Sequence, residues 1–360
     1  MDAIQFESIF TILTAATIGM LSLAYFQPMK LIVQIPAYNE EATIAQVIRD
    51  VPRTLPGFDA IEVLVIDDGS VDRTVAEAQA AGADHIVSLG HNRGLALAFQ
   101  TGLDACLRQG ANVIVNTDGD HQYPGEFIGA LVQPILDGQA DLVIGDRQVD
   151  QIAHFSARKR LMERFGSWIV RMASGINVPD APSGFRAYSR EAALRLFVTS
   201  DFSYTLDNLI QAGKRGLKVS HVPIHTNPTR PSKLHRGSWH FVKRQAATIV
   251  RAYATYEPLK TFFYLSLPFL IISAFFFIRL LVIYIRDGFA LAGHVQSLLL
   301  AIALAIVGFL VLIVGLLADR IGDSRRLSEE ILYRLRQAEL AHRNLSSVLD
   351  PAAHEKDVTQ

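Results

Sequence analysis

The sequence predicts an α/β protein in which a Rossmann-like, mixed but mostly parallel sheet is covered by helices on both faces, followed by transmembrane helices. Two observations lead to this prediction. Buried apolar runs that end in polar clusters alternate with segments of helical spacing over residues 30–146, as in parallel strands joined by helical crossovers. Two later apolar segments, 262–285 and 295–318, hold 24 residues each, about 36 Å as helix and enough to cross a hydrocarbon core of about 30 Å.

The elements follow one another along the first half of the chain. A strand begins at Lys30 in KLIVQIPAYNE, and EATIAQVIRDVP predicts a helix with one apolar face formed by Ile44, Val47, Ile48 and Val51. The strand IEVLVIDDGS ends in two aspartates, and SVDRTVAEAQAAG predicts a helix with Ser70 or Asp72 as its cap. A short strand in DHIVSLG, a helix in GLALAFQTGLDACLRQG and strands in NVIVNTDGD and DLVIGDR complete the series.

The bulk composition narrows the function classes. Half of the 360 residues are hydrophobic and the formal net charge is −1, so nothing global indicates nucleic acid as a partner. The single cysteine, Cys106, rules out an internal disulfide framework and fits a reducing compartment. Because Cys106 lies within a helical segment, we interpret it as a core thiol and not as a nucleophile.

A third candidate span, 8–26, lies near the start of the chain and has 19 uncharged residues. A signal peptide is the alternative, but its first residues carry Asp2 and Glu7 where a signal peptide carries Lys or Arg, so we favour a retained span. Basic residues border the spans on one side: Lys30, Lys260, Arg320, Arg325 and Arg326. The positive-inside rule therefore predicts a multi-pass protein of the inner (cytoplasmic) membrane, with residues 30–260 and the C-terminal tail in the cytoplasm.

Polar clusters stand at the carboxyl ends of the predicted strands, where open parallel sheets bind their ligands. The stretch NTDGDHQYP is the most acidic of them. If the chain stays extended there, Asp118, Asp120 and Gln122 point to the same side and form an oxygen cluster suited to a hard divalent cation. An acidic surface turn is the alternative reading of this stretch alone.

Two common nucleotide motifs are missing from the sequence. No Gly-x-Gly-x-x-Gly follows a predicted strand and no Gly-x-x-x-x-Gly-Lys-[Ser/Thr] occurs. The sequence therefore lacks the motifs that usually indicate a dinucleotide-binding enzyme or a P-loop protein. A cation site facing acidic strand ends suggests instead a nucleotide diphosphate bridged to the protein by metal.

Five motifs, PAYNE, DDGS, HNRG, DGDHQYP and SGFR, occur in this order over residues 30–234. Together they resemble glycosyltransferase family 2, which has the GT-A fold. With two C-terminal spans, the chain resembles the membrane-anchored polyprenyl-phosphate sugar synthases, a group that includes dolichyl-phosphate mannose synthases and bactoprenol glucosyltransferases. The resemblance implies an inverting transfer of a sugar from a UDP- or GDP-linked donor to a polyprenyl (undecaprenyl or dolichyl) phosphate, giving a lipid-linked sugar for cell-envelope glycan or protein glycosylation.

The resemblance also implies site residues. The nucleotide sugar would be held by Pro36, Tyr38, Glu40, Asp67, Asp68, Ser70, Arg93 and Asp118. The metal, Mg²⁺ or Mn²⁺, would be held by Asp118, Asp120 and Gln122, and would neutralise the departing diphosphate. The lipid phosphate would be gripped by Arg147, Arg158, Arg186 and Lys233, because a guanidinium binds phosphate oxygens bidentately. Asp118, Asp120 and Arg186 are the implied catalytic residues.

The predicted domain order is an N-terminal segment (1–29), a GT-A domain (30–235), an interfacial helix (236–260), two spans (261–318) and a C-terminal helix with a tail (319–360). Residues 236–260 have the pattern of a basic amphipathic helix at the membrane interface, and a core helix is the competing reading. In the C-terminal helix, Leu327, Ile331, Leu335 and Ala338 form one stripe. Pairing with a second copy or a partner and packing against the domain fit this stripe equally well.

Two other functions are alternatives to the synthesis of a lipid-linked sugar. A processive polysaccharide synthase shares the fold, but its Gln-x-x-Arg-Trp signature does not occur here. A non-catalytic membrane scaffold with a degenerate domain would have no need of the acidic cluster or of SGFR.

Overall fold

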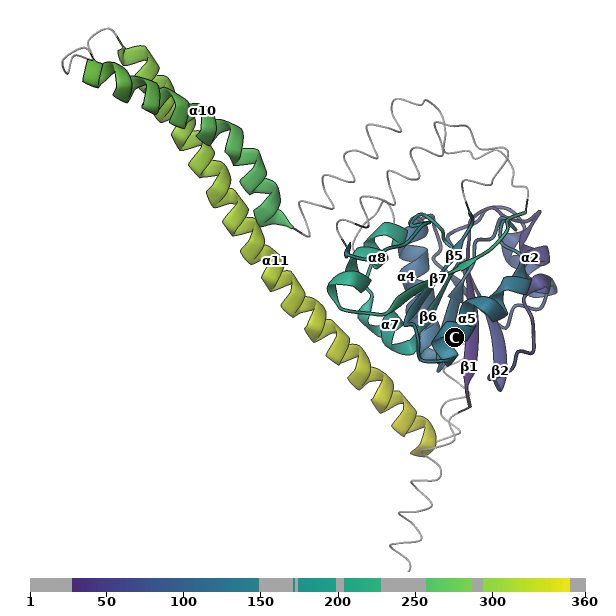
Figure 1. Cartoon of the computed structure of the whole chain (residues 1–360). Helices are drawn as coiled ribbons and strands as arrows, with labels where there is room; N and C mark the ends of the chain where they lie inside the picture. The colour runs from purple at the N-terminus through teal and green to yellow at the C-terminus, as the bar shows by residue number, and fades with distance from the viewer. Residues whose placement is uncertain are drawn as a thin grey trace, which may run out of the picture. The chain divides into compact units, whose positions relative to one another are not determined.

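The computed structural model of the chain describes residues 28–148, 171, 174–198, 204–227, 257–286 and 294–349 (Figure 1). The predicted span 8–26 and nearly all of the predicted interfacial helix lie outside these residues, as do Arg158 and Lys233.

Seven strands form one mixed sheet in the order β3-β2-β1-β4-β6-β5-β7. β1 pairs in parallel with β2 and with β4, and β2 pairs in parallel with β3, whereas β4 and β6 are antiparallel. This confirms the predicted mixed, mostly parallel sheet. The strands are β1 (Lys30–Ala37), β2 (Ala60–Asp67), β3 (His85–Ser88), β4 (Val113–Asn116), β5 (Leu142–Asp146), β6 (Arg186–Ser189) and β7 (Val219–Pro223).

The central strands are buried on both faces because their sequences are apolar without alternation, as in parallel sheets. All residues from Leu31 to Ala37 are buried, and β4 has no exposed residue. Helix α4 packs on β1 and β2, where its Gly102 lies against Gln34 and Ile66. Cys106 is fully buried in the same helix, and burial raises the pKa of its thiol well above the ordinary value, which confirms a core thiol.

The helices of the α/β part are α2 (Ile44–Asp50), α3 (Thr74–Ala80), α4 (Leu95–Arg108), α5 (Ile128–Leu136), α7 (Arg190–Arg195) and α8 (Tyr204–Lys214), with a 3₁₀ turn, η1 (Gly125–Phe127), before α5. The predicted apolar face of α2 is confirmed, because Ile44, Val47, Ile48 and Val51 are at most 3% exposed. For α3, the N-cap residue is Arg73 and not Ser70 or Asp72, so the predicted cap is wrong; Asp72, one residue earlier, accepts the Thr74 N–H at 2.9 Å.

The chain divides into two compact units, which are described separately below. The described residues of the first unit lie within 1–143, 184–190 and 225–227. The described residues of the second lie within 144–183, 191–224 and 228–360, and include the two long helices α10 (Pro258–Arg286) and α11 (Val295–Leu349).

Helices α10 and α11 are long and apolar enough to cross a membrane, and pack against each other as a hairpin. Only 11% and 17% of their most apolar windows are buried, unlike the core helix of a soluble protein. The packing follows a seven-residue spacing: Ser266, Ser273 and Leu280 are buried on α10, and Ala301, Gly308 and Gly315 recur on α11. A Cβ at Gly315 would lie 2.7 Å from the Phe262 Cβ, so the small residue permits this close approach.

Helix α11 does not end where its apolar segment ends, which differs from the separate C-terminal helix that the sequence predicts. It continues for 55 residues as one helix because no Pro and no Gly at a left-handed φ interrupts it. Its polar half contacts α7 and the residue that follows α8: Arg215 pairs with Glu329 at 2.6 Å, and Tyr333 donates a hydrogen bond to Glu191 of α7 at 2.9 Å. Of the two readings of this segment, packing against the domain therefore holds for one face of the helix.

Candidate functional site

Most of the predicted site residues come together in the first unit, at the carboxyl ends of β1, β2 and β4. In register, Ala37 of β1 lies opposite Asp67 of β2, and Gln34 lies opposite Asn116 at the end of β4. The polar residues that follow these strands therefore share one edge of the sheet, as the sequence predicts.

The loop after β1 is held to the loop after β2 by polar contacts. The Asn39 N–H donates to the Ser70 hydroxyl at 3.0 Å, and the Asn39 side chain accepts the Val71 N–H at 2.9 Å. The Glu40 N–H donates to the Thr74 hydroxyl at 2.8 Å. Pro36, near the end of β1, is buried, whereas Tyr38 in the braced loop is 44% exposed and its ring is available to contact a ligand.

The two aspartates after β2 are buried and bind the protein's own loops. Asp67 accepts the Ser70 N–H and the Ser88 hydroxyl, both at 2.9 Å. Asp68 accepts the Arg93 N–H at 2.7 Å with one oxygen and the Gly94 N–H at 2.9 Å with the other. The predicted nucleotide role of Asp68 is thus joined by a structural one: its carboxylate clamps the HNRG loop.

Gly69 makes this clamp possible. Its φ of +75° lies in the left-handed region, and a Cβ there would lie 2.4 Å from the His91 backbone carbon. Only glycine, which has no Cβ, can adopt that backbone conformation at such a close approach. The clamped loop leaves Arg93 exposed beside the strand ends, where its guanidinium can reach an anionic ligand.

The acidic stretch after β4 is a turn and not an extended strand, which corrects the basis on which the sequence placed three side chains on one side. β4 ends at Asn116, and His121 has a φ of 60°. Asp120 accepts the Gln122 N–H at 3.1 Å, an interaction that closes a turn. Asp118, Asp120 and Gln122 are nevertheless all half-buried on this one turn.

Contacts from Thr43, Asp50 and Asn227 hold the acidic turn in place, and none of these contacts is predicted from the sequence. Thr43, before α2, donates its hydroxyl to the Gly119 carbonyl at 2.7 Å. His121 lies 2.5 Å from the Asp50 carboxylate at the end of α2. Asn227 donates its side-chain amide to the His121 carbonyl at 3.1 Å and its backbone N–H to the Gln122 carbonyl at 3.0 Å. These partners are distant in the sequence, so no local sequence pattern predicts them.

The donor set of this turn fits a divalent cation that is shared with a ligand. Among the described residues, no group of three or more His, Cys, Asp or Glu side chains could hold a metal ion by itself. Two carboxylates and an amide on one turn are, however, the kind of incomplete set that Mg²⁺ uses when substrate phosphates supply further ligands. The residues therefore suit a cation that arrives with a diphosphate better than a permanently bound one.

The predicted phosphate-binding arginines have different surroundings. Arg186 begins β6, lies opposite Asn116 of β4 and is fully buried. Arg147, in the second unit, binds Asp180 bidentately at 2.7 and 2.8 Å, with the arginine side chain 9% and the aspartate 1% exposed. The buried carboxylate engages one edge of this guanidinium, its Nε and Nη2, so the predicted phosphate-binding role of Arg147 would have to use the remaining N–H groups.

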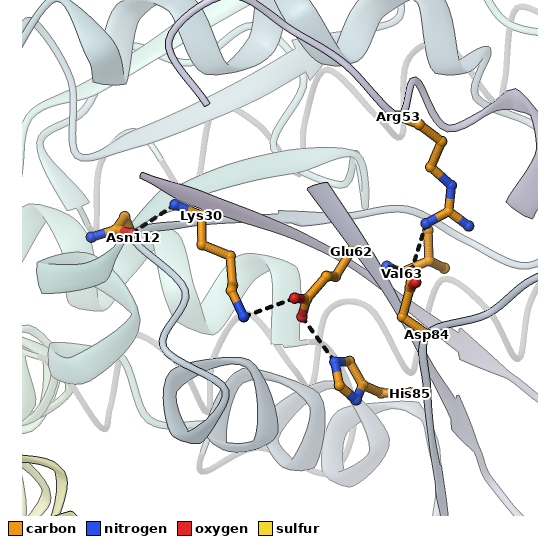
Figure 2. A network of polar contacts seen from close by, with 7 residues as sticks. All are labelled: Lys30, Arg53, Glu62, Val63, Asp84, His85 and Asn112. Carbon is orange, nitrogen blue, oxygen red and sulfur yellow. Dashed lines mark hydrogen bonds and ion pairs between the residues drawn. The ribbon is translucent and has the colours of Figure 1, made fainter. Parts of the chain in front are cut away.

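The opposite, amino edge of the sheet carries a polar network of another kind (Figure 2). Glu62 accepts from Lys30 and lies against His85, both at 2.8 Å, and the network continues through Arg53, Asp84 and Asn112. Burial opposes ionisation of Glu62, but the bonds to Lys30 and His85 outweigh it and lower the pKa of this carboxyl. These charges satisfy one another, so we assign this edge to stability.

Comparison with known proteins shows what the chain is similar to. Residues 32–197 match the model of glycosyl transferase family 2. A protein of Methanocaldococcus jannaschii without an assigned function is 32% identical over 58% of this chain and 86% of its own length. The polyprenol monophosphomannose synthase of Mycolicibacterium smegmatis is 30% identical over 54% of this chain and 76% of its own length.

A solved structure resembles the fold as well. The glucosyl-3-phosphoglycerate synthase of Mycobacterium tuberculosis, in complex with Mn²⁺, UDP-glucose and phosphoglyceric acid, matches with a TM-score of 0.51 and 26% identity. The match covers 66% of this chain and 82% of that one.

Proposed function

The chain belongs to glycosyltransferase family 2, and from this premise we propose that it transfers a sugar from a nucleotide-diphosphate sugar to a polyprenyl phosphate at a membrane, with inversion at the anomeric carbon. The product would be a lipid-linked sugar.

One observation supports a lipid acceptor over a soluble one: the catalytic unit is followed by two apolar helices whose surfaces are mostly exposed. Their composition suits lipid tails, and a transferase anchored by them meets its acceptor in the same bilayer. The relative from Mycolicibacterium smegmatis is named for a polyprenol product, which agrees with this choice. We place the catalytic unit on the cytoplasmic side of a multi-pass protein, following the distribution of Lys and Arg.

On the donor side, we assign the nucleotide to the braced loops after β1 and β2. Tyr38 would lie along the base or ribose, and Arg93 would reach the phosphates from the loop that Asp68 clamps. Asp118, Asp120 and Gln122 would hold Mg²⁺ or Mn²⁺. When bound there, the cation supplies charge neutralisation for the diphosphate leaving group. Asp67 and Asp68, buried and bonded to the neighbouring loops, would keep these loops in one conformation before the donor binds.

On the acceptor side, the nucleophile is a phosphate oxygen that is already anionic at neutral pH, so no strong general base is required. The residues of this chain then have to orient that oxygen and compensate its charge. We assign this task to Arg186, Arg158 and Lys233, and leave Arg147 to its pair with Asp180. The preference of guanidinium for bidentate phosphate contacts supports the assignment.

The experiment is transfer of radiolabel from a panel of UDP- and GDP-linked sugars by purified protein in vesicles that contain undecaprenyl phosphate. We expect an organic-extractable product that mild acid hydrolyses. Asp120→Ala should abolish transfer and metal-dependent nucleotide binding, whereas Asp137→Ala, on the far end of α5, should leave both unchanged.

A water-soluble polymer would instead indicate a processive synthase, and label transferred only to a soluble phosphorylated acceptor would contradict the lipid acceptor. Full activity in the presence of a chelator would contradict the metal role.

A further inference from the structure

The polar half of α11 has an apolar stripe on the side that faces away from α7. Leu327, Ile331 and Leu335 recur every four residues and are 67%, 58% and 61% exposed. Tyr333, which contacts α7, is two residues from Ile331 and therefore about 200° away around the helix. One face of this segment is thus packed, and the opposite face is apolar and uncovered by any described residue.

Lipid tails do not reach this stripe if the apolar segment of α11 spans the membrane, as the proposed function assumes. That segment ends at Ala318. Leu327 lies nine residues further on, about 13 Å along the helix, and Leu335 lies about 25 Å further on. The stripe is therefore beyond the hydrocarbon core, where an uncovered row of large aliphatic side chains is unfavourable.

The stripe continues the outer side of the membrane segment of the same helix. Phe309, Ile313 and Leu317 precede it with the same four-residue spacing and are 61%, 49% and 60% exposed. Two copies of the chain in one bilayer hold their α11 helices parallel and at the same depth. Each stripe would then meet its own counterpart in register, which is the condition for a symmetric contact.

The charges beside the stripe do not oppose such a contact. Arg334 pairs with Glu330 at 2.9 Å, and Arg320 pairs with Asp323 at 3.6 Å, each within its own helix. Two copies therefore bring together cations that are already neutralised, together with three aliphatic side chains from each helix.

From these observations we propose that Leu327, Ile331 and Leu335 form the cytoplasmic contact of a parallel homodimer. Three such side chains bury about 100 Å² each, far below the about 800 Å² per partner of a stable soluble dimer. Confinement in a bilayer supplies the missing association through a high effective concentration. The dimer should form in membranes and dissociate when the protein is diluted in detergent.

The test is a cysteine scan of residues 327–337 in the full chain, reconstituted in vesicles at low protein density and oxidised with copper phenanthroline. The wild-type chain is the blank, because Cys106 is fully buried. We expect disulfide-linked dimers at Leu327, Ile331 and Leu335 at least five times as abundant as at Glu330 and Gln337, which are exposed on the flank of the helix.

A flat profile, or stripe cysteines that are shielded from a thiol reagent without forming dimers, would overturn the proposal. The second result would identify a segment of the same chain, such as residues 1–27, as the occupant. Alkaline extraction of the same vesicles separates the two hypotheses. Extraction of the protein would overturn membrane anchoring and the dimer together, whereas retention with a flat profile would overturn the dimer alone.

Discussion

Asp68 shows how a single carboxylate can fix the conformation of a loop before any ligand is present. Each of its oxygens accepts one backbone N–H, from Arg93 and from Gly94, and the side chain is only 4% exposed. Hydrogen bonds to a buried charged acceptor are among the stronger ones in proteins. The position of the Arg93 guanidinium therefore depends on a residue that it follows by 25 positions in the chain.

Replacing this clamp should weaken donor binding more than it weakens the fold. Asp68→Asn keeps the shape but offers one acceptor where there were two, and its amide group faces a backbone N–H. We expect the affinity for nucleoside diphosphate to fall about tenfold, or about 1.4 kcal/mol, as measured by calorimetry. Asp59→Asn is the matched control, since Asp59 accepts a backbone N–H from Met29 at the amino edge. Equal losses in both variants would refute the clamp.

At the acidic turn, the sequence predicts a candidate site but the wrong local conformation. DGDHQYP indicates a ligand site because carboxylates follow a buried strand, and this signal is local. The left-handed φ of His121 depends on Asp50 and Asn227, which are 71 and 106 residues away. The alternation of side chains along a strand carries no information about such distant partners. A prediction based on it therefore extends the strand into residues that form a turn.

The strands and helices also differ in how well the local sequence predicts them. β1, β2 and β4 were predictable because each is an apolar run that ends in polar residues. β6 has four residues and begins with Arg186, a charged residue that is fully buried. Its antiparallel place beside β4 comes from tertiary packing, which overrides the weak local preference. The continuity of α11 is not predicted for another reason: the composition changes there from apolar to polar, which suggests a boundary, although no residue in it breaks a helix.

The packing of α10 against α11 depends on a glycine at their point of close approach. A Cβ at Gly315 would meet the Phe262 Cβ at 2.7 Å, whereas nothing lies within 4 Å of a Cβ at Gly322, seven residues further on. Gly315→Ala should therefore force the helices apart at a cost of about 1–3 kcal/mol and lower the thermal midpoint in detergent by several degrees.

Gly322→Ala provides the matched control for this change. It should leave the midpoint unchanged or raise it slightly, because alanine is the better helix former. If both variants behaved alike, the close contact between α10 and α11 would be refuted.

At the scale of the whole molecule, we assign the amino edge of the sheet to stability and the carboxyl edge to the proposed function. The amino edge is a saturated network around Glu62, whose pKa is lowered relative to its ordinary value of 4.5. A carboxyl with a lowered folded pKa stabilises the fold above its unfolded pKa. That contribution is lost as the pH falls through the folded value.

Acid titration should reveal this contribution. Between about pH 5.5 and about pH 3.5, the wild-type thermal midpoint should fall more steeply than that of Glu62→Gln. The difference should correspond to about 0.5–1 kcal/mol, because the pair is partly exposed and screened by solvent. Parallel curves for the two proteins would show that the network at the amino edge does not stabilise the fold.

If α11 spans a membrane, as the proposed function assumes, its unbroken length makes bilayer thickness relevant to the second unit of the protein. A helix of 55 residues is about 82 Å long, and no hinge separates its apolar half from the half that is ion-paired to Arg215. Apolar spans adapt to thinner or thicker membranes by changing their tilt. In a stiff helix we expect that tilt to be passed on to α7 and Arg215, so that a change of lipid composition would act mechanically on the second unit without any ligand being bound.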